Sequence, residues 1–361
     1  MPLTIFAVGD IMLGEQPLCE NFGVKTVVQT KGTEYLFREV SSLLKTGDIV
    51  FGNLECSLAL HDMDLKKGSF FCSYGHVVHG LKGAGFTALL VANNHIMENG
   101  KRRFSETVHA LQDEGITPVG VLGEIPVIEI MGYRVAFLGY SFIDDGIPDV
   151  CYTRVTSEEP IIDDIRAVRS DADIVIIALH WGYEYVPFPS PDQVRIGRAL
   201  VDAGADIILG GHPHVTQGYE IYRNRPILYS LGNFVFDQTF IPSTLDSFIT
   251  KISVSDHPFL IDVEIFPVRI DDRAYFPKPL SSPESEKMLM TVAELRSQLE
   301  KTNTNDYELQ YKNYISIYQE RKRPVIRRMG THFISNLHRY SLKTISLIVC
   351  SFVKRRNRCS R

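Results

Sequence analysis

The hydrophobic positions of the first 210 residues fall into two kinds of stretch, short apolar runs and longer segments with helical spacing. In the segment 35–44, for example, Leu36, Phe37, Val40 and Leu44 recur at intervals that predict one amphipathic helix. The apolar runs predict strands at 5–8, 49–51, 87–91, 126–130, 134–139, 174–179, 207–209, 227–230, 234–236 and 259–268. Helices are predicted at 35–44, 77–84, 103–114, 161–169 and 193–203.

Strands that alternate with helices in this way predict an α/β domain with largely parallel strands. Met131, Gly132 and Tyr133 separate two of the apolar runs, which indicates a hairpin with a glycine turn. A second hairpin region follows later, so we also expect a second, mixed sheet.

The pattern changes after Asp271. Pro277, Pro279 and Pro283 predict an irregular linker, and the spacing then predicts helices at 284–301, 306–323 and 331–353. We therefore expect two parts, an α/β domain at 1–270 and a linker with a helical, basic extension at 271–361.

Charge is distributed unevenly along the 361 residues. The net charge is −5, yet residues 321–361 contain twelve of the 38 Lys and Arg residues and none of the 43 Asp and Glu residues. This basic tail has three interpretations: a solvated terminus, attachment to an anionic membrane surface, or contact with a polyanion. The apolar run 345–353 before Lys354, Arg355 and Arg356 fits the second. Because no RNA- or DNA-binding motif accompanies the tail, nucleic acid is the weakest candidate partner.

The six cysteines show no CxxC pairing, which is typical of reduced thiols in a cytoplasmic protein. The sequence shows no signal peptide, and no apolar run approaches the ~18 residues of a membrane span. We expect a cytoplasmic location or a peripheral one at the membrane.

Polar side chains follow the predicted strands where each strand ends. Ligands of parallel α/β sheets bind beyond the carboxyl ends of the strands, so these side chains are expected to form one site. Carboxylate and imidazole groups together suit Mn²⁺, Fe²⁺ or Zn²⁺. The strand-end residues are Asp10, Asn53, Glu55, Asn93, Asn94, His95, His180, His212, His214 and Asn233.

Six motifs in this order resemble the CapA family of poly-γ-glutamate capsule synthesis proteins, within the metallophosphoesterase-like superfamily. They are Gly9-Asp10-Ile11-Met12-Leu13-Gly14, Asn53-Leu54-Glu55, Asn93-Asn94-His95, Leu179-His180-Trp181-Gly182, Gly211-His212-Pro213-His214 and Ser230-Leu231-Gly232-Asn233-Phe234. The resemblance covers about residues 3–270. It implies a two-sheet sandwich flanked by helices, in the layer order α-β-β-α, to which the helical C-terminal appendage is added.

The resemblance also implies roles for individual residues. Asp10 and His214 would bind a first metal ion, and Asn94, His180 and His212 a second. His95 would donate a proton or contact a phosphate, and Asn53 and Asn94 would belong to the catalytic group. Two positions depart from the superfamily pattern: Met12 stands where a histidine is expected, and Asn53 where a bridging aspartate is expected, so Glu55 would supply the carboxylate. Trp181 and Asn233 are the candidate substrate-binding residues.

The leading hypothesis is a hydrolase or transferase that uses one or two divalent transition-metal ions and a water nucleophile. It would act on an anionic surface polymer such as poly-γ-glutamate, and its partners would be the polymer or the synthase complex. One alternative is a non-enzymatic polymer-binding or synthase scaffold whose site is degenerate at Met12 and Asn53. The other is a phosphoesterase for a small substrate.

Overall fold

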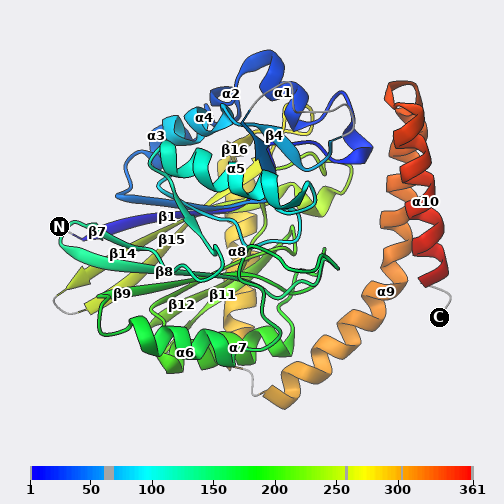
Figure 1. The fold of residues 1–361 in the computed structure, drawn as a ribbon. Helices are drawn as coiled ribbons and strands as arrows, with labels where there is room; N and C mark the ends of the chain where they lie inside the picture. Colours follow the sequence, from blue (N-terminus) through cyan, green and yellow to red (C-terminus); the bar gives the residue numbers. More distant parts are fainter. Residues whose placement is uncertain (1, 61–68, 257–258, 302–303, 359–361) are drawn as a thin grey trace.

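Two β-sheets pack face to face between two layers of helices in the computed structural model of the chain (Figure 1). The structure describes residues 2–60, 69–256, 259–301 and 304–358. The expected α-β-β-α sandwich with a helical C-terminal region is therefore confirmed.

The first sheet has eight strands, parallel at its centre and antiparallel on one side. Its parallel strands are β1 (Leu3–Ile11), β2 (Ile49–Leu54), β5 (Ala88–Leu90) and β6 (Thr117–Val119), with β13 (Asn233–Val235) paired to the end of β1. On the antiparallel side are β14 (Asp246–Asp256), β15 (Phe259–Ile270) and β16 (Pro277–Pro279).

The second sheet has six strands and is mixed, as the two hairpins predict. It runs in the order β11 (Thr216–Tyr222), β12 (Arg225–Leu231), β10 (Ile207–Gly211), β9 (Ile174–His180), β8 (Tyr133–Ser141) and β7 (Val127–Ile130). Both edge strands, β7 and β11, pair antiparallel to their neighbours. A separate parallel pair is formed by β3 (Ser57–Ala59) and β4 (Cys72–Tyr74).

Helices cover the outer face of each sheet (Figure 1). The first sheet carries α1 (Val24–Lys31), α2 (Glu34–Phe37), α3 (Ser41–Leu44), α4 (Val77–Ala84) and α5 (Gly100–Asp113), and the second carries α6 (Glu159–Val168) and α7 (Pro191–Ala203). The single helix predicted at 35–44 is wrong, because the segment divides into α2 and α3. Tight turns, in which Val40 N donates to Phe37 O, keep its apolar side chains buried without one continuous helix.

The strand β9 shows how one apolar run serves two layers. Ile174, Ile176 and Ala178 join the core between the sheets, whereas the alternate residues Val175 and Ile177 join the cluster under α6 and α7. A strand that is buried on both faces is expected to be apolar throughout, and this one is.

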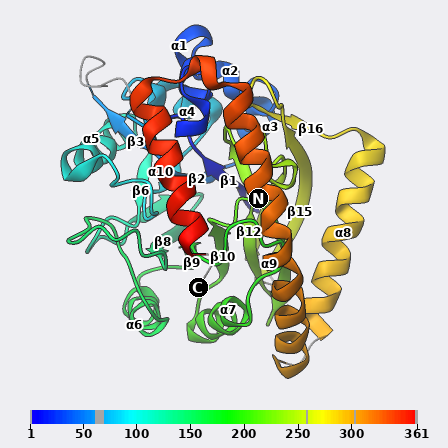
Figure 2. The ribbon, with the colours of Figure 1, turned by 90° about the vertical axis from the view of Figure 1, so that its right-hand side faces the viewer.

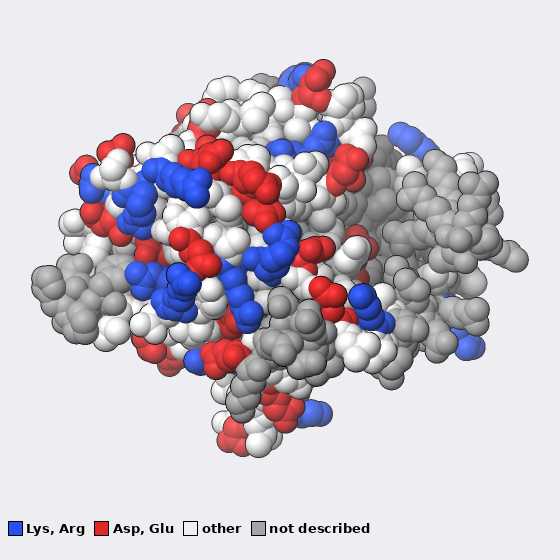
Figure 3. All heavy atoms as spheres, turned by 90° about the horizontal axis from the view of Figure 1, so that it is seen from below, with Lys and Arg blue, Asp and Glu red and all other residues white. Residues whose placement is uncertain are grey.

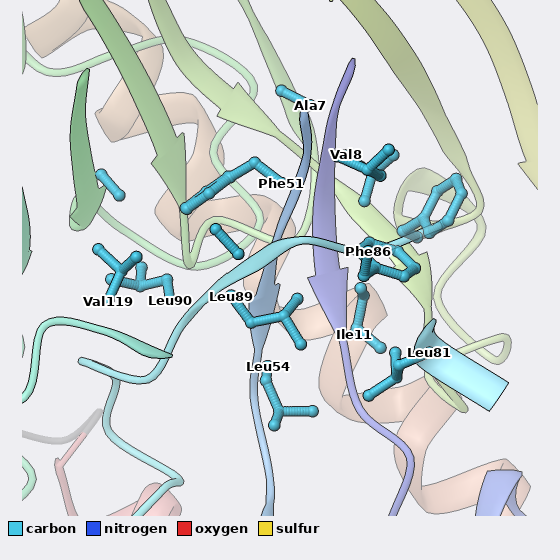
Figure 4. Close-up of a cluster of buried hydrophobic side chains, with 14 of the residues drawn as sticks. Ala7, Val8, Ile11, Phe51, Leu54, Leu81, Phe86, Leu89, Leu90 and Val119 are labelled. Atoms are coloured by element: carbon cyan, nitrogen blue, oxygen red, sulfur yellow. The ribbon is translucent and has the colours of Figure 1, made fainter. Parts of the chain in front are cut away.

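Aromatic rings connect the layers of the sandwich. The ring of Phe51 on β2 stacks on that of Phe137 on β8, with centroids 6.0 Å apart and planes 8° apart. Figure 4 shows Phe51 on one side of the first sheet, and Val8, Ile11 and Phe86 on the other. The two faces of the first sheet therefore belong to different apolar layers.

The C-terminal region is helical, but its elements differ from those predicted. The proline-rich linker contains the edge strand β16, and α8 (Ser282–Lys301) begins with Pro283 in its first turn, where its missing N–H costs nothing. α8 packs against β11 and β15 at the side of the sandwich, so part of the region contacts the α/β strands. The division at residue 270 stays a prediction.

Two long helices follow α8 and form a hairpin, α9 (Thr304–Ser335) and α10 (Leu342–Arg358) (Figure 2). The prediction of a helix that ends at 323 is wrong, because α9 continues to Ser335. The predicted helix at 331–353 is also wrong. It is interrupted at Leu337–Arg339, and the Ser341 hydroxyl accepts from Thr344 N at the start of α10.

We expect Phe137→Ala to lower the free energy of unfolding by about 3–5 kcal/mol, because it removes a buried ring that joins the two sheets. Urea denaturation would measure the loss, with Leu122→Ala at an exposed position as the control. A loss no larger than that of the control would contradict packing of the sheets through this pair.

Candidate metal centre

The ends of parallel strands from both sheets meet at one place. Asp10, the penultimate residue of β1, lies beside Asn53 on β2 and Asn233 on β13, while His180 ends β9 beside Gly211 on β10. A backbone group of one sheet is hydrogen-bonded to a side chain of the other here, because His212 N, just after β10, donates to Asp10 Oδ2 at 3.3 Å. Parallel pairing therefore brings residues distant in sequence to one edge of the sandwich.

The turn after β10 requires its glycines. A Cβ at Gly210 would lie 2.1 Å from Tyr229 O, and one at Gly211 would lie 2.6 Å from Asp10 Oδ1. His212 and His214 both have positive φ, at 93° and 59°. Only an unusual backbone brings both imidazoles to the same carboxylates, and such strain is typical of functional sites.

Glu55 lies at the centre of the cluster. Its Oε1 is 3.7 Å from His214 Nε2 and 3.8 Å from the Nε2 atoms of both His180 and His95. The side chain is fully buried, and Oε1 has no hydrogen-bond partner. Leaving a buried carboxylate oxygen unpaired is costly, so this geometry calls for a positively charged group.

The neighbouring polar groups hold Asp10 and the histidines in fixed orientations. Asn53 Nδ2 donates to Asp10 Oδ1 at 2.8 Å, and His214 Nδ1 lies 3.2 Å from Asp10 Oδ2. Asn94 Oδ1 lies 2.7 Å from His180 Nε2, and Asn233 Oδ1 lies 2.9 Å from His214 Nδ1.

Burial sets the protonation of the cluster. It lowers the pKa of His180 well below its ordinary value and that of His212 to about 4. It raises the pKa of Glu55 well above its ordinary value, and the Asp10 carboxylate raises it further. Burial also disfavours the charged form of His214, but Glu55 and Asp10 outweigh it and raise the pKa of His214 to about 10. At neutral pH, His180 and His212 are therefore neutral, as metal ligands must be, whereas His214 would release its proton on binding an ion.

The side chains fit a divalent metal ion. Within the described part of the chain, two groups of three possible ligands each have their atoms within 4.8 Å of one another: Glu55 with His212 and His214, and Asp10 with Glu55 and His180. Glu55 belongs to both groups, so its carboxylate is the donor that the two groups share. Imidazole nitrogens with carboxylate oxygens are the donors that Mn²⁺, Fe²⁺ and Zn²⁺ take.

His95 is held at the border of this cluster by Asn93 of its own motif and by two residues that the sequence motifs do not include, Phe71 and Glu98. The ring of Phe71 stacks on it, with centroids 3.8 Å apart and planes 6° apart. Glu98 Oε1 lies 2.6 Å from His95 Nδ1, while Nε2 faces Glu55. Asn93 fixes the preceding turn, because its Oδ1 accepts from His95 N. Glu98, three residues after His95, was detectable from spacing, whereas Phe71 was not.

Two further residues near the cluster were also missed. The charge of Glu184 acts on both His212 and His214, and the ring of Tyr185 lies 6.1 Å from that of His214. They follow His180 in a loop whose backbone contacts the histidine turn, where Tyr185 N donates to Pro213 O. No metal-ligand spacing distinguishes them in the sequence.

Not every candidate residue joins the cluster. Trp181 is the alternate residue after His180 and so faces the opposite side of the strand, where Nε1 donates to Tyr229 O at 2.9 Å. Its indole is buried in the core under α6 and α7, and a substrate contact of Trp181 stays a prediction. Asn233, the other candidate for substrate binding, is buried against His214. Met12 lies in the apolar core and supplies no ligand.

Known structures resemble this fold at low sequence identity. A putative 5'-nucleotidase from Staphylococcus aureus aligns with a TM-score of 0.48 and 15% identity, over 83% of this chain and 58% of that one. The calcineurin-like phosphoesterase YfkN from Bacillus subtilis aligns with a TM-score of 0.46 and 12% identity, over 83% of this chain and 99% of that one.

Sequence comparison finds more similar proteins. The capsule biosynthesis protein CapA of Bacillus anthracis is 35% identical over 305 residues, which are 78% of this chain and 70% of that protein. The PGA biosynthesis protein CapA of Bacillus subtilis (strain 168) is 33% identical over 247 residues, 64% of this chain and 62% of that protein. The model of the bacterial capsule synthesis protein family PGA_cap matches residues 4–238, a range that contains every strand-end residue described above. The chain therefore belongs to the bacterial capsule synthesis protein family PGA_cap.

Proposed function

We propose that this protein is a metal-dependent hydrolase or transferase that acts in the synthesis or processing of an anionic surface polymer such as poly-γ-glutamate. The observation that carries the proposal is the buried Glu55 carboxylate, whose Oε1 has no hydrogen-bond partner and faces three histidines. The names of the two Bacillus relatives, a capsule and a PGA biosynthesis protein, support the class of polymer.

Five side chains would hold the metal: Asp10, Glu55, His180, His212 and His214. Asn94 is a further candidate, because its Oδ1 already lies beside His180 Nε2. A bound divalent ion supplies Lewis-acid polarisation of a substrate oxygen and stabilises negative charge there. Asn53 and Asn233 orient Asp10 and His214 through hydrogen bonds, which keeps the donor atoms converging.

His95 is the proposed proton donor. Its side chain is partly exposed, at 15%, whereas those of His180 and His214 are buried, so His95 can reach a substrate that enters the site. Phe71 fixes the plane of the ring and Glu98 accepts the Nδ1 proton, which leaves Nε2 to give a proton to the leaving group. The stacking keeps the donor atom in place.

A scaffold without catalysis is the second candidate function, and the departures at positions 12 and 53 favour it. Met12 is fully buried and supplies no ligand, and the Asn53 amide donates to Asp10 where a carboxylate would bridge two ions. In this case the site would bind the polymer or a synthase subunit without chemistry.

We expect His95→Ala to lower the rate of polymer cleavage or transfer about 10²- to 10⁴-fold, because it removes the proton donor. The assay would follow the length of poly-γ-glutamate chains by size-exclusion chromatography, with the full chain and Mn²⁺. His109→Ala, which changes an exposed histidine on α5, is the control and should leave the rate unchanged.

Two results together would contradict catalysis and favour the scaffold. One is that the Mn²⁺-loaded wild type processes neither the polymer nor p-nitrophenyl phosphate esters. The other is that His95→Ala still supports polymer formation in cells.

Glu98→Gln should lower kcat about 10- to 100-fold and leave KM nearly unchanged, because Glu98 positions His95 without contacting the substrate. The matched control is Glu114→Gln, since Glu114 makes a similar contact of 2.7 Å with His79 away from the site. Equal kinetics for the two variants would show that the pairing of Glu98 with His95 has no part in the reaction.

A further inference from the structure

The turn between α9 and α10 exposes several apolar side chains close together. Ile334, Leu337 and Leu342 are 72%, 46% and 86% exposed. With the basic residues Arg339 and Lys343, which are also exposed, they form what we call the hairpin tip. Single exposed apolar residues are common in soluble proteins, but three within nine residues at one turn are not.

The rest of the turn is hydrogen-bonded to the body of the protein. The exposure of the three apolar side chains is therefore a feature of the fold and does not result from fraying of the helix ends. Tyr340 Oη donates to Leu18 O at 2.8 Å, and Ser341 N donates to Glu20 Oε2 at 2.7 Å. The ring of Tyr340 also stacks on that of Phe333, at 5.4 Å between centroids. Polar and aromatic residues of the turn thus face the body, while Ile334, Leu337 and Leu342 remain uncovered.

The charged side chains that α9 and α10 expose around the hairpin tip are all basic. Arg327, Arg328 and Lys343 are exposed on the two helices, and residues 321–361 contain no Asp or Glu. The nearby acid Glu20 is buried and already accepts from Ser341. By contrast, the face of the body around α6 and α7 carries acidic and basic side chains mixed together (Figure 3).

Apolar side chains beside a wholly basic surface match the interface of an anionic lipid bilayer. Lipid headgroups attract the Lys and Arg residues, and the boundary with the acyl chains takes up the apolar side chains. A polyanion in water would be attracted to the Lys and Arg residues, but its binding would not bury the apolar side chains of Ile334, Leu337 and Leu342. In the described part of the chain, no helix is long and apolar enough to cross a membrane, so the contact would be at the surface.

We propose that the hairpin tip docks on the surface of an anionic lipid membrane. The segment that holds the tip, Leu18 to Glu20, follows the strand β1, whose penultimate residue is the candidate metal ligand Asp10. Figure 2 shows the hairpin on the side of the molecule where the central strands end. Docking there keeps that side of the sandwich near the bilayer. The proposal does not depend on the metal chemistry.

Cosedimentation of the full chain with lipid vesicles tests the proposal. We expect binding to vesicles that contain phosphatidylglycerol and little binding to pure phosphatidylcholine. Ile334→Ser/Leu337→Ser/Leu342→Ser should weaken binding at least about tenfold, because the apolar contact is lost. Arg327→Glu/Arg328→Glu/Lys343→Glu should weaken it similarly and reduce its dependence on salt.

The matched control is Leu122→Ser/Met131→Ser/Leu260→Ser, which changes three residues of the body with exposures of 59%, 48% and 52%. It should bind like the wild type, and all variants should keep the wild-type circular dichroism. Binding should also survive EDTA, so this result is separate from the metal site. Wild-type protein that does not bind anionic vesicles would overturn the proposal. So would apolar variants that bind normally, or vesicle binding that depends on the charges alone.

Discussion

The carboxylate of Glu55, buried without a hydrogen-bond partner for one oxygen, is the constraint on which the site depends. The protein places this group at the meeting point of two sheets, beside a second carboxylate from Asp10 and three imidazoles. Two buried acids so close together repel each other, and burial already raises the pKa of Glu55. A divalent cation would satisfy both acids at once, and the neutral histidines His180 and His212 would complete its ligands.

The sandwich makes this cluster possible because its strands fix the edge of the sheet at which they end and the face to which each side chain points. Parallel pairing brings the ends of β1, β2, β9 and β10 to the same edge, and alternation decides which neighbour faces the site. His180 points to the cluster and Trp181 points away, although they are adjacent in sequence. The glycines before His212 let the two sheets approach, since any Cβ at Gly211 would collide with Asp10. The geometry of the cluster is therefore a property of the β-framework more than of the loops.

The sequence predicts much of this framework and much of the cluster, for physical reasons. Buried parallel strands appear as apolar runs and end in polar side chains, so the α/β class and the convergence of Asp10, Glu55, His180, His212 and His214 follow from this pattern. The layer order α-β-β-α came from the resemblance to the CapA family. The sequence analysis missed strand β14, although apolar and polar residues alternate along part of it. Polar Thr250 and Ser253 interrupt the run of apolar residues from which a strand is predicted. The helix predicted at 35–44 failed because tight turns bury the same residues as a helix does. Phe71, which fixes His95, lies outside every motif, and only the folded chain brings the two rings together.

The metal content of the purified protein tests the central claim most directly, with wild type and Glu55→Gln measured side by side after incubation with Mn²⁺, Fe²⁺ or Zn²⁺ and dialysis. Glutamine keeps the size of the side chain and removes only the charge that holds the ion. We expect about one or two equivalents of metal in the wild type and less than about a tenth of that in the variant. A wild-type protein that retains no metal, or a variant that retains as much as the wild type, would contradict the account.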